Sequence, residues 1–303
     1  MDMDQKIGAY RQAAGTLPPR LRQEALSLPR EDQSRAEELR LRVGRPMSVV
    51  FSEEEHPLGT EAVEAKELEQ LIEISSRASL HTVLDQVCRG YLTIEGGHRI
   101  GLCGTATLRD GEIHTLSRLS SANLRIARQV RGVSEPILDR LCPKGRLTNT
   151  LILAPPGMGK TTLLRDLVRR VSDGDGCIPR RVSLADERGE VAALYNGMPQ
   201  LEVGGRTDVV EGCPKAQGLM LLLRAMNPQV LAVDEITAPE DVQALKTAFG
   251  CGVTLLATAH GAERGDLERR ALYRPLLEEG MIQRLVSIRS LNGRRNYQVE
   301  ELE

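Results

Sequence analysis

A glycine-rich loop lies between an apolar run and a helix-length segment in the middle of the chain. It reads Leu151-Ile-Leu-Ala-Pro-Pro-Gly157-Met-Gly159-Lys160-Thr161-Thr162 and continues into residues 163–171. Strand, loop and helix in this order are typical of a phosphate-binding loop, because glycines let backbone N–H groups close on the phosphates. We therefore predict a loop that binds ATP through Pro155, Pro156, Gly157, Met158, Gly159, Lys160, Thr161 and Thr162.

Two side chains in this loop have chemistry that suits a metal-bound nucleotide. Lys160 would place a positive charge on the β- and γ-phosphates, and the Thr161 hydroxyl would bind Mg²⁺. Ala154 stands where the usual pattern begins with glycine. That position turns the chain without touching phosphate, so the prediction of a loop that binds ATP and Mg²⁺ stands.

Short apolar runs recur on both sides of this loop. They cover residues 151–153, 182–184, 230–233 and 253–257, with helix-length segments between them. Such runs are typical of buried parallel strands, and alternating strands and helices indicate a doubly wound α/β sheet. We expect this domain to span residues 143–303, with a boundary near residues 136–146.

The earlier residues have a different pattern. Helical spacing appears at residues 13–28 and 65–77, and two candidate β-hairpins pair residues 38–43 with 47–51 and 91–94 with 98–104. We therefore expect residues 1–142 to form a smaller α+β domain of helices packed on antiparallel strands.

Carboxylates follow two of the predicted parallel strands. Asp234 and Glu235 end one apolar run, where the first would hold the water shell of Mg²⁺ and the second would orient an attacking water. Glu187 follows another strand and competes with Glu235 for the role of base, although Glu235 is favoured. His260 ends a third strand, at the position where a side chain that senses the γ-phosphate would lie. The alternative is that His260 is only a histidine in a turn, without a role in binding.

Composition excludes several classes of protein. Forty basic and 42 acidic residues give a net charge of −2, and seven aromatic residues without tryptophan offer few stacking platforms, so we expect no nucleic-acid partner. The longest stretch without a formal charge, residues 247–262, is too short for a membrane span, and the acidic start is unlike a signal peptide. The scattered cysteines predict reduced core residues. We expect a cytoplasmic protein without a transmembrane segment.

Several motifs together resemble the secretion-type (type II/IV secretion superfamily) P-loop ATPases. These are the loop at 154–162, Asp186-Glu-Arg-Gly-Glu190, the strand that ends at Glu235 and Thr258-Ala-His260. Within that superfamily, Gly90-Tyr-Leu-Thr-Ile-Glu-Gly-Gly-His-Arg99, Asn123-Leu-Arg-Ile-Ala-Arg128 and Gly205-Arg-Thr-Asp-Val209 resemble the stage III sporulation protein AA family of endospore formers.

This resemblance covers most of the chain from about residue 80 onward. It implies a RecA-like P-loop ATPase domain and a homo-hexamer on the mother-cell side of a transenvelope channel, in contact with membrane proteins of that sporulation complex. It also implies that Arg125 and Arg128 deliver positive charge to a bound nucleotide. Two other interpretations stay open: a RecA- or AAA-type motor acting on nucleic acid, and a nucleotide-dependent interaction protein with little hydrolysis.

Overall fold

The computed structural model describes residues 2–52, 54–76, 90–291 and 294–302. They form two compact units. The first unit comprises Met1–Gln129 and Ala193–Gln200, and the second comprises Val130–Ala192 and Leu201–Glu303.

The division between the units precedes the boundary expected at residues 142/143. Residues 130–142 belong to the second unit. The Arg140 side chain donates to the carbonyl oxygen of Val299, and the Arg140 backbone carbonyl accepts a hydrogen bond from the Arg284 side chain. The short helix α6 (Leu138–Leu141) and the turns η2 (Glu135–Ile137) and η3 (Pro143–Gly145) occupy this stretch. The segment therefore belongs with the sheet that follows it.

The second unit is built on a mainly parallel sheet with strand order β11-β8-β12-β13-β7-β14-β15 among the described residues. Every neighbouring pair is parallel except β14 with β15. The four apolar runs predicted as parallel strands are confirmed, whereas three strands were not predicted. The predicted strands are β7 (Thr150–Ala154), β8 (Val182–Asp186), β12 (Val230–Val233) and β13 (Thr254–His260), and the others are β11 (Thr207–Glu211), β14 (Arg284–Leu291) and β15 (Arg294–Glu301).

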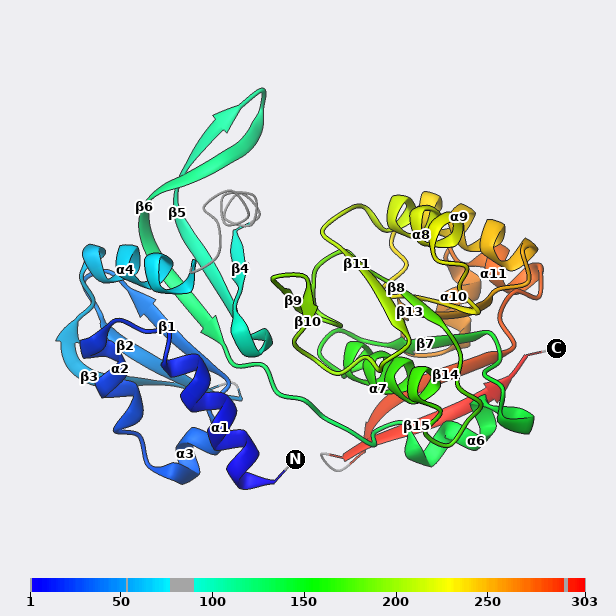
Figure 1. The fold of residues 1–303 in the computed structure, drawn as a ribbon, viewed down its shortest axis with the longest axis horizontal. Coiled ribbons are helices and arrows are strands. Elements are labelled where there is room, and N and C mark those ends of the chain that lie inside the picture. The colour runs from blue at the N-terminus through cyan, green and yellow to red at the C-terminus, as the bar shows by residue number, and fades with distance from the viewer. Residues whose placement is uncertain (1, 53, 77–89, 292–293, 303) are drawn as a thin grey trace. The chain divides into compact units, whose positions relative to one another are not determined.

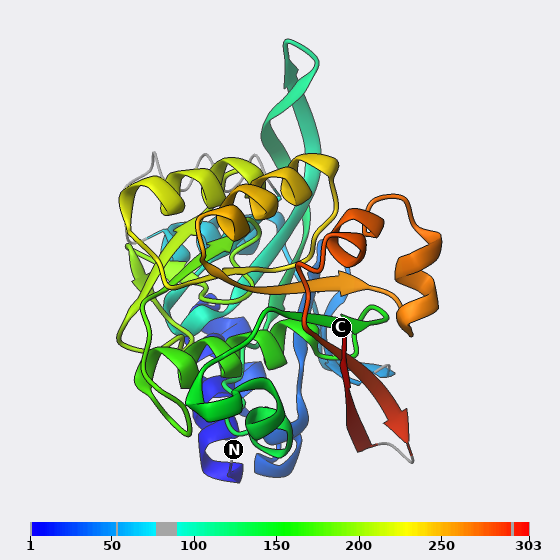
Figure 2. The ribbon, with the colours of Figure 1, turned by 90° about the vertical axis from the view of Figure 1, so that its right-hand side faces the viewer.

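Helices cover both faces of this sheet. Figures 1 and 2 show α7 (Lys160–Asp173) on one face and α8 (Lys215–Ala225) with α9 (Pro239–Gly250) on the other. Two short helices, α10 (Arg264–Arg269) and α11 (Arg274–Glu278), follow β13. All residues of β7, β8 and β12 are buried, which explains their continuous apolar sequences. The expected α/β class is confirmed.

The first unit carries an antiparallel sheet with strand order β3-β2-β1-β6-β5-β4. Both predicted hairpins are confirmed, as β1 with β2 and as β4 with β5. The strands are β1 (Glu38–Arg42), β2 (Pro46–Phe51), β3 (Glu54–Ala62), β4 (Tyr91–Thr93), β5 (Arg99–Arg109) and β6 (Glu112–Arg125), and the turn η1 (Glu95–Gly97) joins β4 to β5.

The helices of the first unit differ from the prediction at one place. Residues 13–28 do not form one helix, because α1 (Met3–Ala14) ends at Gly15 and α2 (Pro19–Leu26) begins after Pro18. Proline suits the first turn of a helix and breaks its interior, so two consecutive prolines start a new helix. The other helices in the described part of this unit are α3 (Arg30–Arg35) and α4 (Ala65–Ser75). Part of the predicted segment 65–77 lies outside the described residues.

One hairpin from the middle of the chain joins the first unit. It consists of β9 (Leu194–Tyr195) and β10 (Met198–Pro199), which pair in antiparallel fashion. The Gln200 side chain that follows accepts a hydrogen bond of 2.9 Å from the backbone N–H of Gly96. The chain therefore crosses between the units more than once.

Two sequence expectations about the surface can be compared with the structure. Of the cysteines described, Cys142 is buried but Cys103 and Cys251 are exposed, so the expectation of core cysteines was wrong for those two. Cys88 lies outside the described residues. In the part of the chain that the structure covers, no helix combines the length and the apolar character needed to cross a membrane.

We predict that the buried His98 makes the first unit sensitive to acid. Its Nδ1 accepts a 3.0 Å hydrogen bond from the Ala127 N–H, and burial, helped by the charge of Arg128, lowers the pKa of His98 to about 4. The unfolded chain binds this proton near pH 6.5, so stability falls as the pH drops from 6.5 toward 4, by up to about 3 kcal/mol.

Urea unfolding followed by circular dichroism would measure this loss. His98→Gln should flatten the fall in stability between pH 6.5 and 4, whereas His56→Gln, at an exposed histidine, should leave it unchanged. Equal slopes for wild type and His98→Gln would contradict the prediction.

Candidate functional site

The glycine-rich loop joins the end of β7 to the start of α7. Gly157 has φ +74° and Gly159 has φ +92°, conformations that only glycine adopts without strain. Gly159 is the N-cap of α7, which begins at Lys160. The loop therefore presents backbone N–H groups at the positive end of a 14-residue helix, an arrangement suited to binding an anion.

Lys160 lies against the loop with only 7% of its surface exposed. Its Nζ donates to the carbonyl oxygens of Ala154 (2.9 Å) and Pro155 (3.1 Å) and lies 3.0 Å from His260 Nδ1. Burial lowers the pKa of Lys160, while the charges of Glu235 and Asp234 act in the opposite direction. A phosphate could replace the neutral carbonyl acceptors as a stronger, charged partner.

The half-buried carboxylate of Asp234 connects the loop helix to two strands. Its Oδ2 accepts the Thr161 hydroxyl (2.9 Å) and its Oδ1 accepts the Thr258 hydroxyl (3.0 Å). Thr258 Oγ1 in turn accepts the backbone N–H of Glu235 at 2.8 Å. Burial raises the pKa of Asp234, and the two hydroxyl hydrogen bonds oppose that shift.

Thr161 and Asp234 are the two residues predicted to hold Mg²⁺, and the structure brings them into contact. Hydroxyl and carboxylate oxygens are the donors that Mg²⁺ prefers, usually together with phosphate oxygens and water. Among the residues described here, no group of three or more His, Cys, Asp or Glu side chains could bind a metal by itself. The Thr161 hydroxyl and the Asp234 carboxylate are oxygen donors of the kind that fits Mg²⁺.

Glu235 and His260 form a pair beside Lys160. His260 Nε2 lies 2.7 Å from Glu235 Oε1, and the other ring nitrogen contacts Lys160. Glu235 has φ +57°, a left-handed conformation that is strained for a residue with a side chain. Strained backbone of this kind is common at functional sites. The structure thus places Glu235, His260 and Lys160 in one hydrogen-bonded chain.

The acids after β8 make different contacts. Glu187 forms an ion pair of 3.0 Å with Lys215 on α8. Asp186 accepts backbone N–H groups of Glu190, Val191 and Ala192 at 2.8 to 3.0 Å. Burial raises the pKa of Asp186, and these backbone hydrogen bonds oppose the shift. Sequence reasoning missed Lys215, which is separated from Glu187 by more than twenty residues and has no motif around it.

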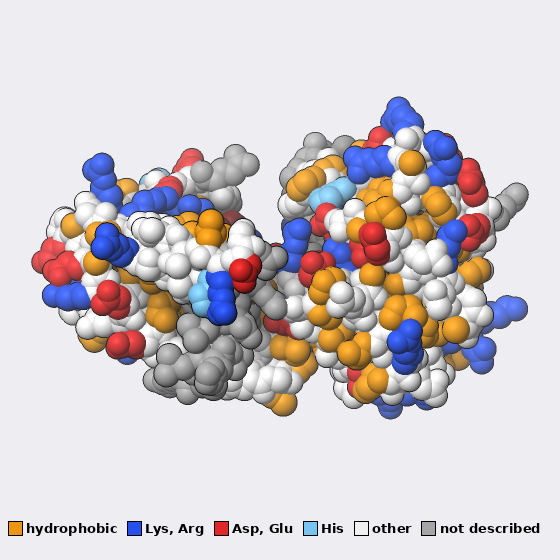
Figure 3. Space-filling view, turned by 90° about the horizontal axis from the view of Figure 1, so that it is seen from above, with side chains coloured by type: hydrophobic (Ala, Val, Ile, Leu, Met, Phe, Trp, Pro, Cys, Tyr) orange, Lys and Arg blue, Asp and Glu red, His pale blue; other side chains and the backbone are white. Residues whose placement is uncertain are grey.

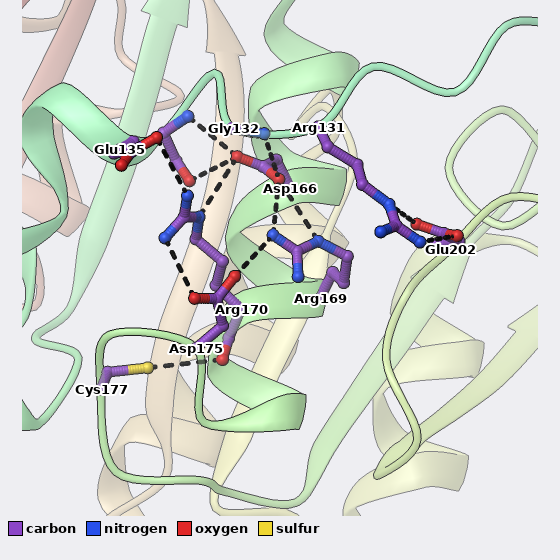
Figure 4. Close-up of polar contacts among 10 residues, drawn as sticks. Arg131, Gly132, Glu135, Asp166, Arg169, Arg170, Asp175, Cys177 and Glu202 are labelled. Carbon is purple, nitrogen blue, oxygen red and sulfur yellow. Dashed lines mark hydrogen bonds and ion pairs between the residues drawn. The ribbon is translucent and has the colours of Figure 1, made fainter. Parts of the chain in front are cut away.

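Helix α7 also holds two distant chain segments through adjacent residues. Arg165 donates to the carbonyls of Val191 and Glu190, each at 2.6 Å. Asp166, completely buried, accepts N–H groups from Gly132 (3.1 Å) and Ser134 (2.9 Å). Figure 4 shows this carboxylate facing residues 132–134, with Arg169 and Arg170 beside it. The phosphate-loop helix is therefore fixed to two segments of the second unit: residues 132–134, which begin it, and residues 190–191, which precede the hairpin β9–β10.

The two arginines predicted to act on the nucleotide lie in the first unit and differ in environment. Arg125 is 59% exposed and its Nε lies 3.6 Å from a Glu38 carboxylate oxygen. Arg128 is half-buried and donates to the carbonyls of Ala36 (2.7 Å) and Gln33 (3.4 Å). Burial lowers the pKa of Arg128. Arg128 thus has a structural role within its own unit, whereas Arg125 presents its guanidinium to solvent.

Comparison with known proteins identifies relatives along nearly the whole chain. The family model for sporulation stage III, protein AA matches residues 11–296. Stage III sporulation protein AA of Bacillus subtilis (strain 168) is 38% identical over 281 residues, which cover 92% of this chain and 91% of that protein.

Two solved structures share the fold at low sequence identity. The ATPase DotB of Legionella pneumophila has a TM-score of 0.54 and 17% identity over 88% of this chain and 76% of its own. The pilus retraction motor PilT, solved with bound ADP, has a TM-score of 0.61 and 16% identity over 88% of this chain and 80% of its own. The resemblance to secretion-type ATPases predicted from the sequence is therefore confirmed at the level of fold.

We predict that the backbone strain at Glu235 is measurable as lost stability. Glu235→Gly and Glu235→Ala remove the same carboxylate and the same contact to His260, but only glycine adopts φ +57° without strain. Glu235→Gly should therefore be more stable than Glu235→Ala by about 1 kcal/mol, even after the entropy cost of glycine. Urea unfolding of both variants measures the difference, and an alanine variant equal to or more stable than the glycine variant would refute it.

Proposed function

The chain belongs to the sporulation stage III, protein AA family, and from that premise we propose that it is an ATPase that hydrolyses Mg·ATP to power or gate a transenvelope channel during endospore formation. The observation that carries the proposal is the hydrogen bond between Thr161 on the phosphate loop and Asp234 after β12. It brings the two Mg²⁺ donors together at the N-terminus of α7, beside Lys160.

Each residue of the site has a role in this proposal. The loop 155–162 binds ATP, with the Gly157 and Gly159 conformations opening its N–H groups to phosphate and Lys160 adding a charge. Thr161 and Asp234 hold Mg²⁺, which neutralises phosphate charge when bound. Glu235 orients the attacking water as general base, and His260 contacts both Glu235 and Lys160.

The contacts of the two candidate bases support Glu235. The Glu235 carboxylate is paired with His260, which also touches the lysine of the phosphate loop. The Glu187 carboxylate is instead paired with Lys215 on α8. Glu187 is therefore assigned to positioning and Glu235 to the water.

We further propose the assembly that the family resemblance implies: a homo-hexamer in the mother-cell cytoplasm, peripheral at the membrane and bound to membrane proteins of the channel complex. Nucleic acid is not part of this proposal. Figure 3 shows basic and acidic side chains interspersed over both units on the face drawn, without a broad positive surface, in accord with the net charge of −2.

We predict that two substitutions separate binding from hydrolysis. Lys160→Ala should abolish ATP binding, because the loop loses the cation nearest the phosphates, whereas Glu235→Gln should bind ATP like the wild type and lose turnover by at least a hundredfold. Calorimetry measures binding, and phosphate release measures turnover.

Controls for this pair address the alternative functions. Wild-type affinity in Lys160→Ala would overturn the nucleotide site, and unchanged turnover in Glu235→Gln would favour an interaction protein with vestigial hydrolysis. Phosphate release strongly stimulated by DNA would favour a nucleic-acid motor instead.

We predict that alanine substitutions at Arg125 and Arg128 affect different properties, turnover in the first case and stability in the second. Arg125→Ala should keep wild-type stability and nucleotide affinity but lose turnover about 10³-fold, as expected for an arginine that stabilises the transferring phosphate. Arg128→Ala should lower stability by about 1–3 kcal/mol, because its two carbonyl partners lose a charged donor. Urea unfolding and phosphate release distinguish the two variants.

A mixing experiment tests whether Arg125 acts on a neighbouring subunit. Arg125→Ala and Glu235→Gln proteins are each inactive alone in this proposal, and mixed assemblies should regain part of the activity if the arginine acts in trans. Absence of rescue in intact assemblies would place its action within one subunit, and full activity of Arg125→Ala would remove it from the mechanism.

A further inference from the structure

An arginine on the last hairpin of the chain lies over the phosphate loop. Strand β14 runs parallel to β7, with Ser287 opposite Leu153 near the end of β7. β14 continues beyond that point, and Ser290, three residues farther on, pairs with Arg295 of the returning strand β15. The register therefore carries Arg295 past the end of β7, to the level of the glycine-rich loop.

The side-chain position agrees with the register. A Cβ built on Gly159 would lie 2.9 Å from Cζ of Arg295, 3.0 Å from Nη1 and 3.2 Å from Nε. The guanidinium thus occupies the space that glycine leaves free, against the residue that caps α7. The positive φ requires glycine at position 159, and the missing Cβ lets the guanidinium come this close to the loop.

This guanidinium has no anionic partner in the described part of the chain. Arg295 is exposed, and among the described residues no hydrogen bond or ion pair to its side chain is found. It lies beside the N-terminus of α7, which carries partial positive charge, and against Gly159, the neighbour of Lys160 in the glycine-rich loop. Like charges brought together in this way favour an anion between or beside them.

We propose that Arg295 is a nucleotide-binding residue whose guanidinium binds the phosphate chain of the nucleotide held by the loop 155–162. This inference rests on the proposed function and adds a contact from β15 that no motif indicates. A guanidinium offers paired donors to phosphate oxygens, in contrast to the single ammonium of Lys160. The hairpin β14–β15 would then be part of the nucleotide site and not merely the edge of the sheet.

Calorimetric titration of the full chain with ADP and with inorganic pyrophosphate tests the proposal. Arg295→Ala should weaken both ligands by about tenfold to a hundredfold, and Arg295→Lys should recover part of that loss. The matched control is Arg289→Ala, because Arg289 is exposed on the same hairpin but pairs with Asn296, on the opposite face from the Ser290–Arg295 pair. This control should bind both ligands like the wild type.

The outcomes separate the inference from the proposed function. Wild-type affinity in Arg295→Ala, or an equal loss in Arg289→Ala, overturns the role of Arg295 alone. Weakened ADP binding with unchanged pyrophosphate binding overturns the phosphate assignment in favour of a contact to the nucleoside. Wild-type protein that binds neither ADP nor ATP overturns the proposed function, and the inference with it. Melting temperatures of all variants confirm that the fold is intact.

Discussion

A buried carboxylate must be supplied with hydrogen-bond donors, and this constraint organises the second unit. The half-buried Asp234 accepts the hydroxyl groups of Thr161 on α7 and Thr258 on β13, so three elements meet at one side chain. Asp186 and Asp166 meet the same need with backbone N–H groups of residues 190–192 and of Gly132 and Ser134. Removing the donors would leave charged groups buried without partners, at a cost of several kcal/mol each. Segments next to the sheet are therefore held by acids at the ends of β8 and β12 and by an acid on α7.

The sequence predicted those parts of the fold that depend on local pattern. Apolar runs such as residues 230–233 identify buried strands, and the glycines with Lys160 and Thr161 identify a phosphate loop, because each signal lies within a dozen residues. The alternation at 286–289 and the Asn-Gly pair at 292–293 are comparable local hairpin signals. Strands β14 and β15 therefore have a local sequence signal, although they are not among the predicted strands.

Other features depend on partners that are far apart in the chain. Nothing near Glu187 indicates that its carboxylate meets Lys215, and nothing near Arg128 indicates that it donates to carbonyls at the C-terminal end of α3. The hairpin β9–β10 belongs to the first unit although the residues on both sides belong to the second. These partners are set by tertiary packing and not by the local sequence. Glu187 and Glu235 both follow a buried strand, yet one pairs with Lys215 and the other with His260.

The hydrogen bonds of the adjacent residues Arg165 and Asp166 couple the motion of helix α7 to that of two other chain segments. They project about 100° apart around α7, so one helix holds residues 190–191 on one side and residues 132–134 on another. A helix of 14 residues is stiff over its length, and its first residue is Lys160 of the phosphate loop. A tilt of α7 would therefore displace residues 132–134 and 190–191 together with Lys160 of the phosphate loop, so within the second unit these three segments move as one body.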